Sequence, residues 1–262
     1  MSRICPLFSG STGNSTYIAT SQGGFLVDAG ASYKGLCNAV SAAGGDIKDI
    51  KAVAVTHEHI DHVKGLKTLL KSCSIPLIAS TDTLNALIAA DRVPAGANLI
   101  AIDTQDAIFG DVKIERFATS HDCVGSSGYT LTLPDGIRTA VCTDLGVMTN
   151  EIRQKLNGCN AVVIESNHDV RMVENGPYPP HLKLRILSDA GHLSNNACAS
   201  ELPELLKNGT TRIILGHISQ KNNLPMLAIS AAKSALMDIG AEMGKHYLLY
   251  AARPDKNEVF PL

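Results

Sequence analysis

The feature that most constrains the fold is a group of histidines at the end of an apolar run. His57, His59 and His62 crowd together with Asp61 directly after Ala52-Val53-Ala54-Val55. Such a run predicts a buried β-strand, so these polar side chains emerge where the strand ends. Alternate residues of extended backbone point the same way, so His57 and His59 can share one target. Asp61 and His62 lie at the start of the following helix, so their side chains can point toward a second target. The group therefore predicts two adjacent metal positions.

Two metal ions need about seven ligands, so further ligands must come from elsewhere in the chain. Three more polar residues stand at the ends of apolar runs that read as strands: His121, Asp144 and His217. Asp144 suits a bridging position, because its two oxygens can neutralise part of two cations. Imidazole and carboxylate ligands favour Zn²⁺ or Mn²⁺, with Fe also compatible.

Hydrophobic patterning predicts the rest of the fold. Short apolar runs between Gly and polar residues predict strands at the N-terminus and near 16–19, 24–28, 52–56, 76–79, 98–102, 112–118, 127–133, 136–143, 161–165, 212–216 and 246–249. Helical spacing is found near 33–43, 62–71, 81–90, 149–156, 182–188, 195–207 and 224–239. Two β-rich halves, each flanked by helices, imply a four-layer αββα sandwich of the α/β (α+β) class. No linker divides the chain, so we expect one domain over residues 1–262.

Composition sets limits on location and partners. A net charge of −2 neither demands nor excludes a nucleic-acid partner. No apolar stretch is long enough to span a bilayer, and the N-terminus does not resemble a secretory signal. The seven cysteines are scattered without a Cys-x-x-Cys pair, which argues against a disulfide framework or a cysteine zinc site. These features favour a cytoplasmic protein. Cys123 is the thiol nearest in sequence to a predicted ligand.

These motifs together resemble the metallo-β-lactamase superfamily. The resemblance is carried by Thr56-His57-Glu58-His59-Ile60-Asp61-His62, by Asp28 in Leu26-Val27-Asp28-Ala29-Gly30, and by His121, Asp144 and His217 in that order. It implies that His57, His59 and His121 hold one metal and that Asp61, His62 and His217 hold the second, with Asp144 between them. It also implies that Asp28 hydrogen-bonds a ligand histidine, and that a metal-bridging hydroxide is the nucleophile.

Further segments narrow the resemblance to the bacterial YycJ/WalJ group, nearly end to end. They are 8–16, Glu165-Ser166-Asn167-His168-Asp169, Gly176-Pro177-Tyr178-Pro179, Gly191-His192-Leu193-Ser194-Asn195 and 216–223. This resemblance implies a two-metal phosphodiesterase, a 5′-to-3′ exonuclease acting on double-stranded DNA. About 70 residues separate Asp144 from His217, which is too few for the inserted domain of ribonuclease J-like enzymes.

Catalytic roles are predicted for Asp61 and for His192, which is similar to a histidine that precedes the last ligand in ribonuclease Z. His192 would protonate the leaving alkoxide; alternatively it orients the helix that begins near Asn195. His168 either contacts a substrate phosphate or holds its loop. Ser11 and Asn14, in a Gly/Ser-rich loop, and Ser194 are further candidates for substrate contact, although such a loop can equally be a simple turn. His181 and His246 are expected to be structural or exposed.

Two other functions stay open. A small thioester or lactone hydrolase would use similar metal motifs with a small acyl pocket and no basic groove. A binding module without turnover is less consistent with a complete set of ligands. Lys183, Arg185, Lys207, Arg212 and Lys221 either follow a DNA backbone or form solvated helix faces.

Overall fold

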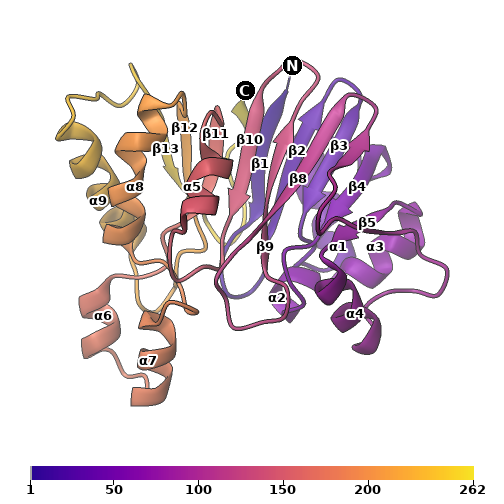
Figure 1. Ribbon diagram of the computed structural model, residues 1–262, viewed down its shortest axis with the longest axis horizontal. Coiled ribbons are helices and arrows are strands. Elements are labelled where there is room, and N and C mark those ends of the chain that lie inside the picture. Colours follow the sequence, from indigo (N-terminus) through magenta and orange to yellow (C-terminus); the bar gives the residue numbers. More distant parts are fainter. Residues whose placement is uncertain (1) are drawn as a thin grey trace.

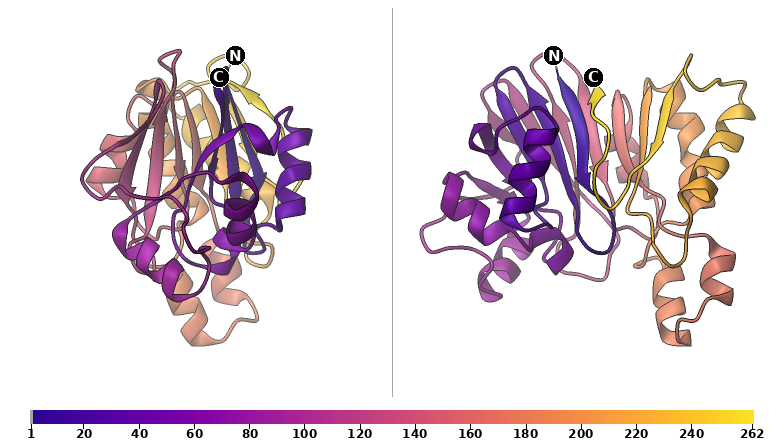
Figure 2. Two further views of the ribbon diagram at one scale, coloured as in Figure 1. Left: turned by 90° about the vertical axis from the view of Figure 1, so that its right-hand side faces the viewer. Right: turned by 180° about the vertical axis from the view of Figure 1, so that it is seen from behind.

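Two mixed β-sheets pack face to face, and helices cover the outer side of each (Figures 1 and 2). The computed structural model describes residues 2–262. The first sheet has the order β14 (Phe260–Pro261), β1 (Arg3–Phe8), β2 (Ser15–Thr20), β3 (Gly23–Val27), β4 (Ile50–Ala54), β5 (Leu77–Ala79) and β6 (Leu99–Ala101). The second has the order β13 (Leu248–Ala251), β12 (Arg212–Gly216), β11 (Ala161–Glu165), β10 (Arg138–Cys142), β9 (Ser127–Thr132), β8 (Val112–Ala118) and β7 (Ala107–Phe109).

The longer helices form the two outer layers. The first sheet is covered by α1 (Tyr33–Ala42), α3 (Leu66–Cys73) and α4 (Thr81–Ala89), and the second by α5 (Asn150–Leu156), α8 (Asn195–Lys207) and α9 (Pro225–Met237). Shorter helical segments are η1 (Ile47–Asp49), α2 (Ile60–Val63), α6 (Val170–Asn175) and α7 (Pro180–Leu187). Figure 1 shows α6 and α7 extending beyond the end of the second sheet. Within residues 2–262, every helix is too short or too polar to cross a bilayer.

Buried apolar side chains show why the fold has four layers. In β4, Ala52 and Ala54 belong to the core between the sheets, whereas Val53 packs toward the helices. In β11, Val163 likewise faces the other sheet and Val162 faces the helices. A strand that is buried on both faces reads as a continuous apolar run, which is the signal found in the sequence. The predicted αββα sandwich is therefore confirmed.

Element boundaries differ from the prediction in a few places. The helix expected over 62–71 is two helices, α2 and α3, separated at Gly65. The backbone of Gly65 lies so close to Ala31 that a Cβ atom there would be 2.2 Å from the Ala31 carbonyl oxygen. The last long strand is β13 rather than 246–249. The prediction missed β7, α6 and β14, which contain three, six and two residues.

Candidate metal centre

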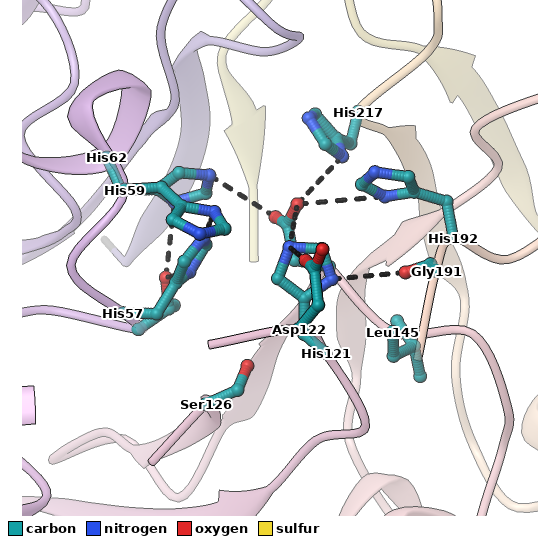
Figure 3. A network of polar contacts seen from close by, with 12 residues as sticks. His57, His59, His62, His121, Asp122, Ser126, Leu145, Gly191, His192 and His217 are labelled. Carbon is teal, nitrogen blue, oxygen red and sulfur yellow. Dashed lines mark hydrogen bonds and ion pairs between the residues drawn. The ribbon is translucent and has the colours of Figure 1, made fainter. Parts of the chain in front are cut away.

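The predicted ligands meet at one end of the two facing sheets. Each follows the carboxyl end of a strand: His57 after β4, His121 after β8, Asp144 after β10 and His217 after β12. Figure 3 shows His57, His59 and His62 on one side of the site, His192 and His217 on the other, and His121 between them. Parallel strands end at the same edge of a sheet, so residues far apart in sequence come together there.

Three site residues have an unusual backbone conformation. Asp28, Asp144 and His217 adopt φ values of 65°, 59° and 51°, in the left-handed region that non-glycine residues rarely occupy. Each stands just beyond the end of its strand. Such backbone costs on the order of 1–3 kcal/mol per residue and persists where the surrounding structure enforces it. The backbone strain at these three residues is therefore the cost of directing their side chains into the site.

His57, His59 and His121 form the first group of nitrogens that could hold a metal ion. Their donor atoms lie within 4.8 Å of one another, and His57 Nε2 is 3.0 Å from His59 Nδ1. His121 Nδ1 is 3.1 Å from the Gly191 carbonyl oxygen, which can only accept, so Nδ1 carries the proton and Nε2 is free to face the site. The separation of 3.0 Å between the His57 and His59 nitrogens fits two ligands that share one ion.

Asp61, His62 and His217 form the second group, again with donor atoms within 4.8 Å. His62 Nδ1 donates to Asp28 Oδ2 at 2.8 Å, which leaves Nε2 for a cation. Asp28 also accepts hydrogen bonds from the backbone and side chain of Thr56. A carboxylate that holds a histidine by its second nitrogen is the usual arrangement behind a metal ligand.

Asp144 lies between the two groups. Its Oδ2 is 3.3 Å from His62 Nε2, and its Oδ1 is 3.2 Å from His217 Nδ1 and 3.8 Å from His121 Nε2. The side chain is buried, and Oδ2 makes no hydrogen bond within the described part of the chain. His217 Nε2 is also buried and has no hydrogen-bond partner among these residues. Buried polar atoms without partners are costly, and divalent cations on this nitrogen and carboxylate set would satisfy them.

Glu165 is the site residue that the sequence interpretation missed. It ends β11, is fully buried, and its Oε1 lies 2.9 Å from His192 Nδ1 and 2.7 Å from His217 Nδ1. Its Oε2 accepts hydrogen bonds from the backbone N–H groups of Leu145 and Leu193. A carboxylate has about four acceptor positions, and these four contacts occupy them, so Glu165 can orient the two histidines. Its carboxylate also lies within 4.8 Å of ligand atoms of Asp144, His192 and His217, a further group that could hold a metal ion. The available signal was a carboxylate directly after an apolar strand, as at Asp144.

The charges of the site favour cations. Burial alone raises the pKa of the Asp144 carboxyl, but His217 and His62 outweigh this and hold the pKa well below its ordinary value. In Glu165, burial also opposes ionisation, and the neighbouring histidines lower the pKa to about 2. Burial lowers the pKa of His62, but Asp28 and Asp144 outweigh this effect and raise it to about 10. The carboxylates are therefore ionised, and a divalent cation can replace the proton that they hold on His62.

The remaining predicted residues lie at different depths. Ser11 is exposed, and Asn14 is buried with its side-chain amide nitrogen 3.3 Å from Asp61 Oδ2. Ser194 caps α8 by accepting from the Ala197 N–H group. His168 is 1% exposed, which favours its loop-holding role over direct contact with a phosphate. Cys123 is partly buried, and burial raises the pKa of its thiol to about 12.

The burial of His168 leads to a pH prediction. Burial lowers its pKa to about 4, and its Nδ1 has no hydrogen-bond partner among the described residues. The unfolded chain, with an ordinary pKa near 6.5, binds a proton between pH 6.5 and 4 that the folded chain does not, so stability falls as the pH falls through this window. We expect His168 to contribute about 2 kcal/mol of this loss between pH 7 and 5.

Urea unfolding of metal-free protein measures this contribution. His168→Asn should flatten the decline in unfolding free energy between pH 7 and 5, while His181→Asn, at an exposed position, should leave the slope unchanged. Equal slopes for wild type and His168→Asn would show that His168 takes up its proton equally well in the folded protein.

Comparison with known proteins defines the class. A family model described as a beta-lactamase superfamily domain matches residues 24–218, which include every predicted metal ligand. The chain belongs to the metallo-β-lactamase superfamily and is a metal-dependent hydrolase.

Individual relatives agree with this assignment. The chain is 35% identical over 249 residues to the exodeoxyribonuclease YycJ of Bacillus anthracis, covering 95% of this chain and 94% of the relative. It is 34% identical to the exodeoxyribonuclease WalJ of Streptococcus pneumoniae, with coverage of 95% and 93%. The predicted resemblance to the YycJ/WalJ group is confirmed. Among solved structures, the metallo-beta-lactamase fold protein YhfI of Bacillus subtilis superposes with a TM-score of 0.72 at 13% identity, covering 99% of both chains. That match supports the fold alone.

Proposed function

We propose that the protein is a two-metal phosphodiesterase that degrades duplex DNA from the 5′ end, with residues 1–262 acting as one hydrolase domain. The observation that carries the reaction type is the Glu165–His192 pair beside Asp144. The observation that supports the substrate is the identity of about a third to relatives named exodeoxyribonucleases over nearly the whole chain.

We assign one ion to His57, His59 and His121 and the other to Asp61, His62 and His217, with Asp144 shared. Zn²⁺ and Mn²⁺ suit this mixed set of nitrogens and carboxylate oxygens. Two such ions, when bound, would lower the pKa of a bound water to about 7 and would supply positive charge that stabilises the phosphate oxygens. In this proposal Asp61 combines its ligand role with a catalytic one, because it is 22% exposed and can meet substrate.

His192 supplies the acid that phosphodiester cleavage requires. Its Nδ1 donates to Glu165, so Nε2 is the atom that can pass a proton to the leaving oxygen. The side chain is 15% exposed, whereas Glu165 is fully buried, so of the pair only the histidine is accessible to substrate. A thiolate leaving group has a low pKa and needs little such help, so this pair favours an oxygen leaving group over a thioester.

The function is tested with blunt DNA duplexes labelled at either the 5′ or the 3′ end, supplied with Zn²⁺, Mn²⁺ or Mg²⁺. We expect early release of labelled mononucleotide from the 5′ label only. Single-stranded DNA, RNA and closed circular plasmid serve as comparison substrates. Intact duplex DNA together with hydrolysis of a lactone or thioester would reject the nuclease proposal in favour of the small-molecule hydrolase.

Substitution of His192 separates its two possible roles. We expect His192→Gln to lower kcat on DNA by roughly 10²–10⁴-fold, because the leaving alkoxide loses its acid. The loss should be much smaller on bis(p-nitrophenyl) phosphate, whose leaving group needs no proton, and metal content should stay at the wild-type level. Equal losses on both substrates would indicate that His192 instead orients the loop before α8.

A further inference from the structure

We infer that the loop from Ser9 to Asn14, which joins β1 to β2, positions the ligands of the second metal position. These ligands, Asp61, His62 and His217, come from both halves of the protein. This inference rests on the two-metal assignment proposed above. The Ser9–Asn14 loop contacts Asp61 and His62 from the first half and His217 from the second. Its residues position these ligands and do not themselves need to touch the substrate.

Ser9 contacts the second half of the protein at His217. Its side chain is buried, and its Oγ accepts a hydrogen bond of 2.8 Å from the backbone N–H group of His217, 208 positions away. On the other side of the same residue, Asn167 Nδ2 donates to the His217 carbonyl oxygen at 2.8 Å. Both backbone groups of His217 are thus held by side chains. This explains how a non-glycine residue is kept at a φ of 51° with its imidazole directed into the site.

Asn14 holds the first half through both its backbone and its side chain. The Asn14 N–H group donates to the Asp61 carbonyl oxygen at 2.7 Å, and its carbonyl oxygen accepts from Gly30 N at 2.9 Å. A Cβ atom on Gly30 would lie 1.7 Å from the Asp61 carbonyl oxygen, so the three segments meet without space for a side chain. The ligand-bearing turn at Asp61 is therefore fixed against the Ser9–Asn14 loop.

The side-chain amide of Asn14 contacts both its own loop and the proposed ligands. Its Oδ1 accepts from Gly10 N at 2.9 Å, and its Nδ2 lies 3.1 Å from Gly10 O, 3.3 Å from Asp61 Oδ2 and 3.0 Å from His62 Nε2. An amide nitrogen has two protons. When a cation uses the lone pair of His62 Nε2, these two protons serve Gly10 O and Asp61 Oδ2. One side chain then closes the loop and orients a ligand carboxylate.

The Ser9–Asn14 loop contacts only one of the two groups of proposed ligands among the described residues. Among the hydrogen bonds of residues 2–262, those of the Ser9–Asn14 loop reach Asp61, His62 and His217 and none reaches His57, His59 or His121. Loss of the hydrogen bonds of the Ser9–Asn14 loop should therefore lower the metal affinity of the second position and leave that of the first unchanged. Groups behind metal ligands typically change affinity by ~10–100-fold.

The test measures metal binding directly. Metal-free wild type, Ser9→Ala, Asn14→Ala and Thr12→Ala are titrated with Zn²⁺ by calorimetry, and bound metal is counted by mass spectrometry after desalting. We expect about two equivalents for wild type, and for Thr12→Ala, whose side chain is exposed in the same loop. Ser9→Ala and Asn14→Ala should keep one equivalent at wild-type affinity and bind the other ~10–100-fold more weakly. Ser9→Thr, which restores a hydroxyl, should recover the second equivalent.

Outcomes are distinguishable. Binding of both ions with wild-type affinity by Ser9→Ala and Asn14→Ala overturns the inference and leaves the proposed function intact. A single equivalent in wild type overturns the two-metal proposal and this inference with it. The retained first equivalent reports folding in each variant. Ser9→Ala removes one oxygen atom only, so it decides the question if Asn14→Ala does not fold.

Discussion

Replacing Asp144 by asparagine is expected to lower kcat/KM for DNA by roughly 10³-fold or more, because the two metal positions lose the carboxylate between them. Asparagine keeps the shape but not the charge that balances His62 and His217, which lie 3.3 and 3.2 Å from its oxygens. Charge stabilisation at such a site is worth several kcal/mol, and each 1.36 kcal/mol is a factor of ten in rate. Activity and metal content should fall together.

Asp189→Asn is the matched control for Asp144→Asn. Asp189 is exposed and precedes the loop that carries His192, so the same chemical change there should leave metal content and rate at wild-type values. Full metal content with any substantial activity in Asp144→Asn would show that the carboxylate does not bridge the two positions, and the ligand assignment would need revision.

Glu165→Gln is expected to lower kcat by ~10²–10⁴-fold although Glu165 touches neither metal nor substrate in the proposed mechanism. The carboxylate accepts from the Nδ1 atoms of both His192 and His217, and so fixes which nitrogen of each ring is protonated. Both rings contact the same oxygen, and the backbone N–H groups of Leu145 and Leu193 donate to the other. These backbone groups can only donate, so we expect the amide oxygen to face them and the amide nitrogen, a donor, to face the two rings, which then lose their present tautomers. An amide in place of a carboxylate behind a catalytic histidine has a comparable cost in serine proteases.

The test of Glu165→Gln combines rate with the state of the imidazoles. Nitrogen-15 NMR of labelled histidines should show changed tautomers for His192 and His217, at unchanged helix content. Glu201→Gln is the control, because Glu201 pairs with Arg153 at the surface, where such pairs contribute little. A wild-type rate and unchanged histidine spectra in Glu165→Gln would contradict the positioning role.

The two substitutions also separate the halves of the reaction. Asp144→Asn removes charge from the metal positions, so its effect should persist on a substrate with an activated leaving group. Glu165→Gln acts through His192 on the leaving group and through His217 on one metal position, so activation of the leaving group should recover only part of its loss. This contrast follows from Glu165 serving both histidines with one oxygen.

Much of the site was predictable because its chemistry is concentrated at strand ends. An apolar run that forms a strand is followed within a few residues by polar side chains at the edge of the sheet. His57, His121, Asp144 and His217 all follow that rule, and the spacing around His59 and His62 supplies two directions. The four-layer fold was predictable for the same reason, because its central strands are buried on both sides.

The sequence by itself therefore determined the fold, since that depends on local hydrophobic patterning, and the order of the histidines and carboxylates that the fold brings to the proposed metal centre. Only the tertiary structure decided which side chains orient the ligands. Glu165 is 27 positions from His192 and 52 from His217, and Ser9 is 208 positions from His217, so no periodicity connects them. Glu165 and His217 become neighbours because β11 and β12 pair in parallel and end at the same edge. Ser9 reaches His217 because the two sheets face each other, a contact that exists only once both halves have packed.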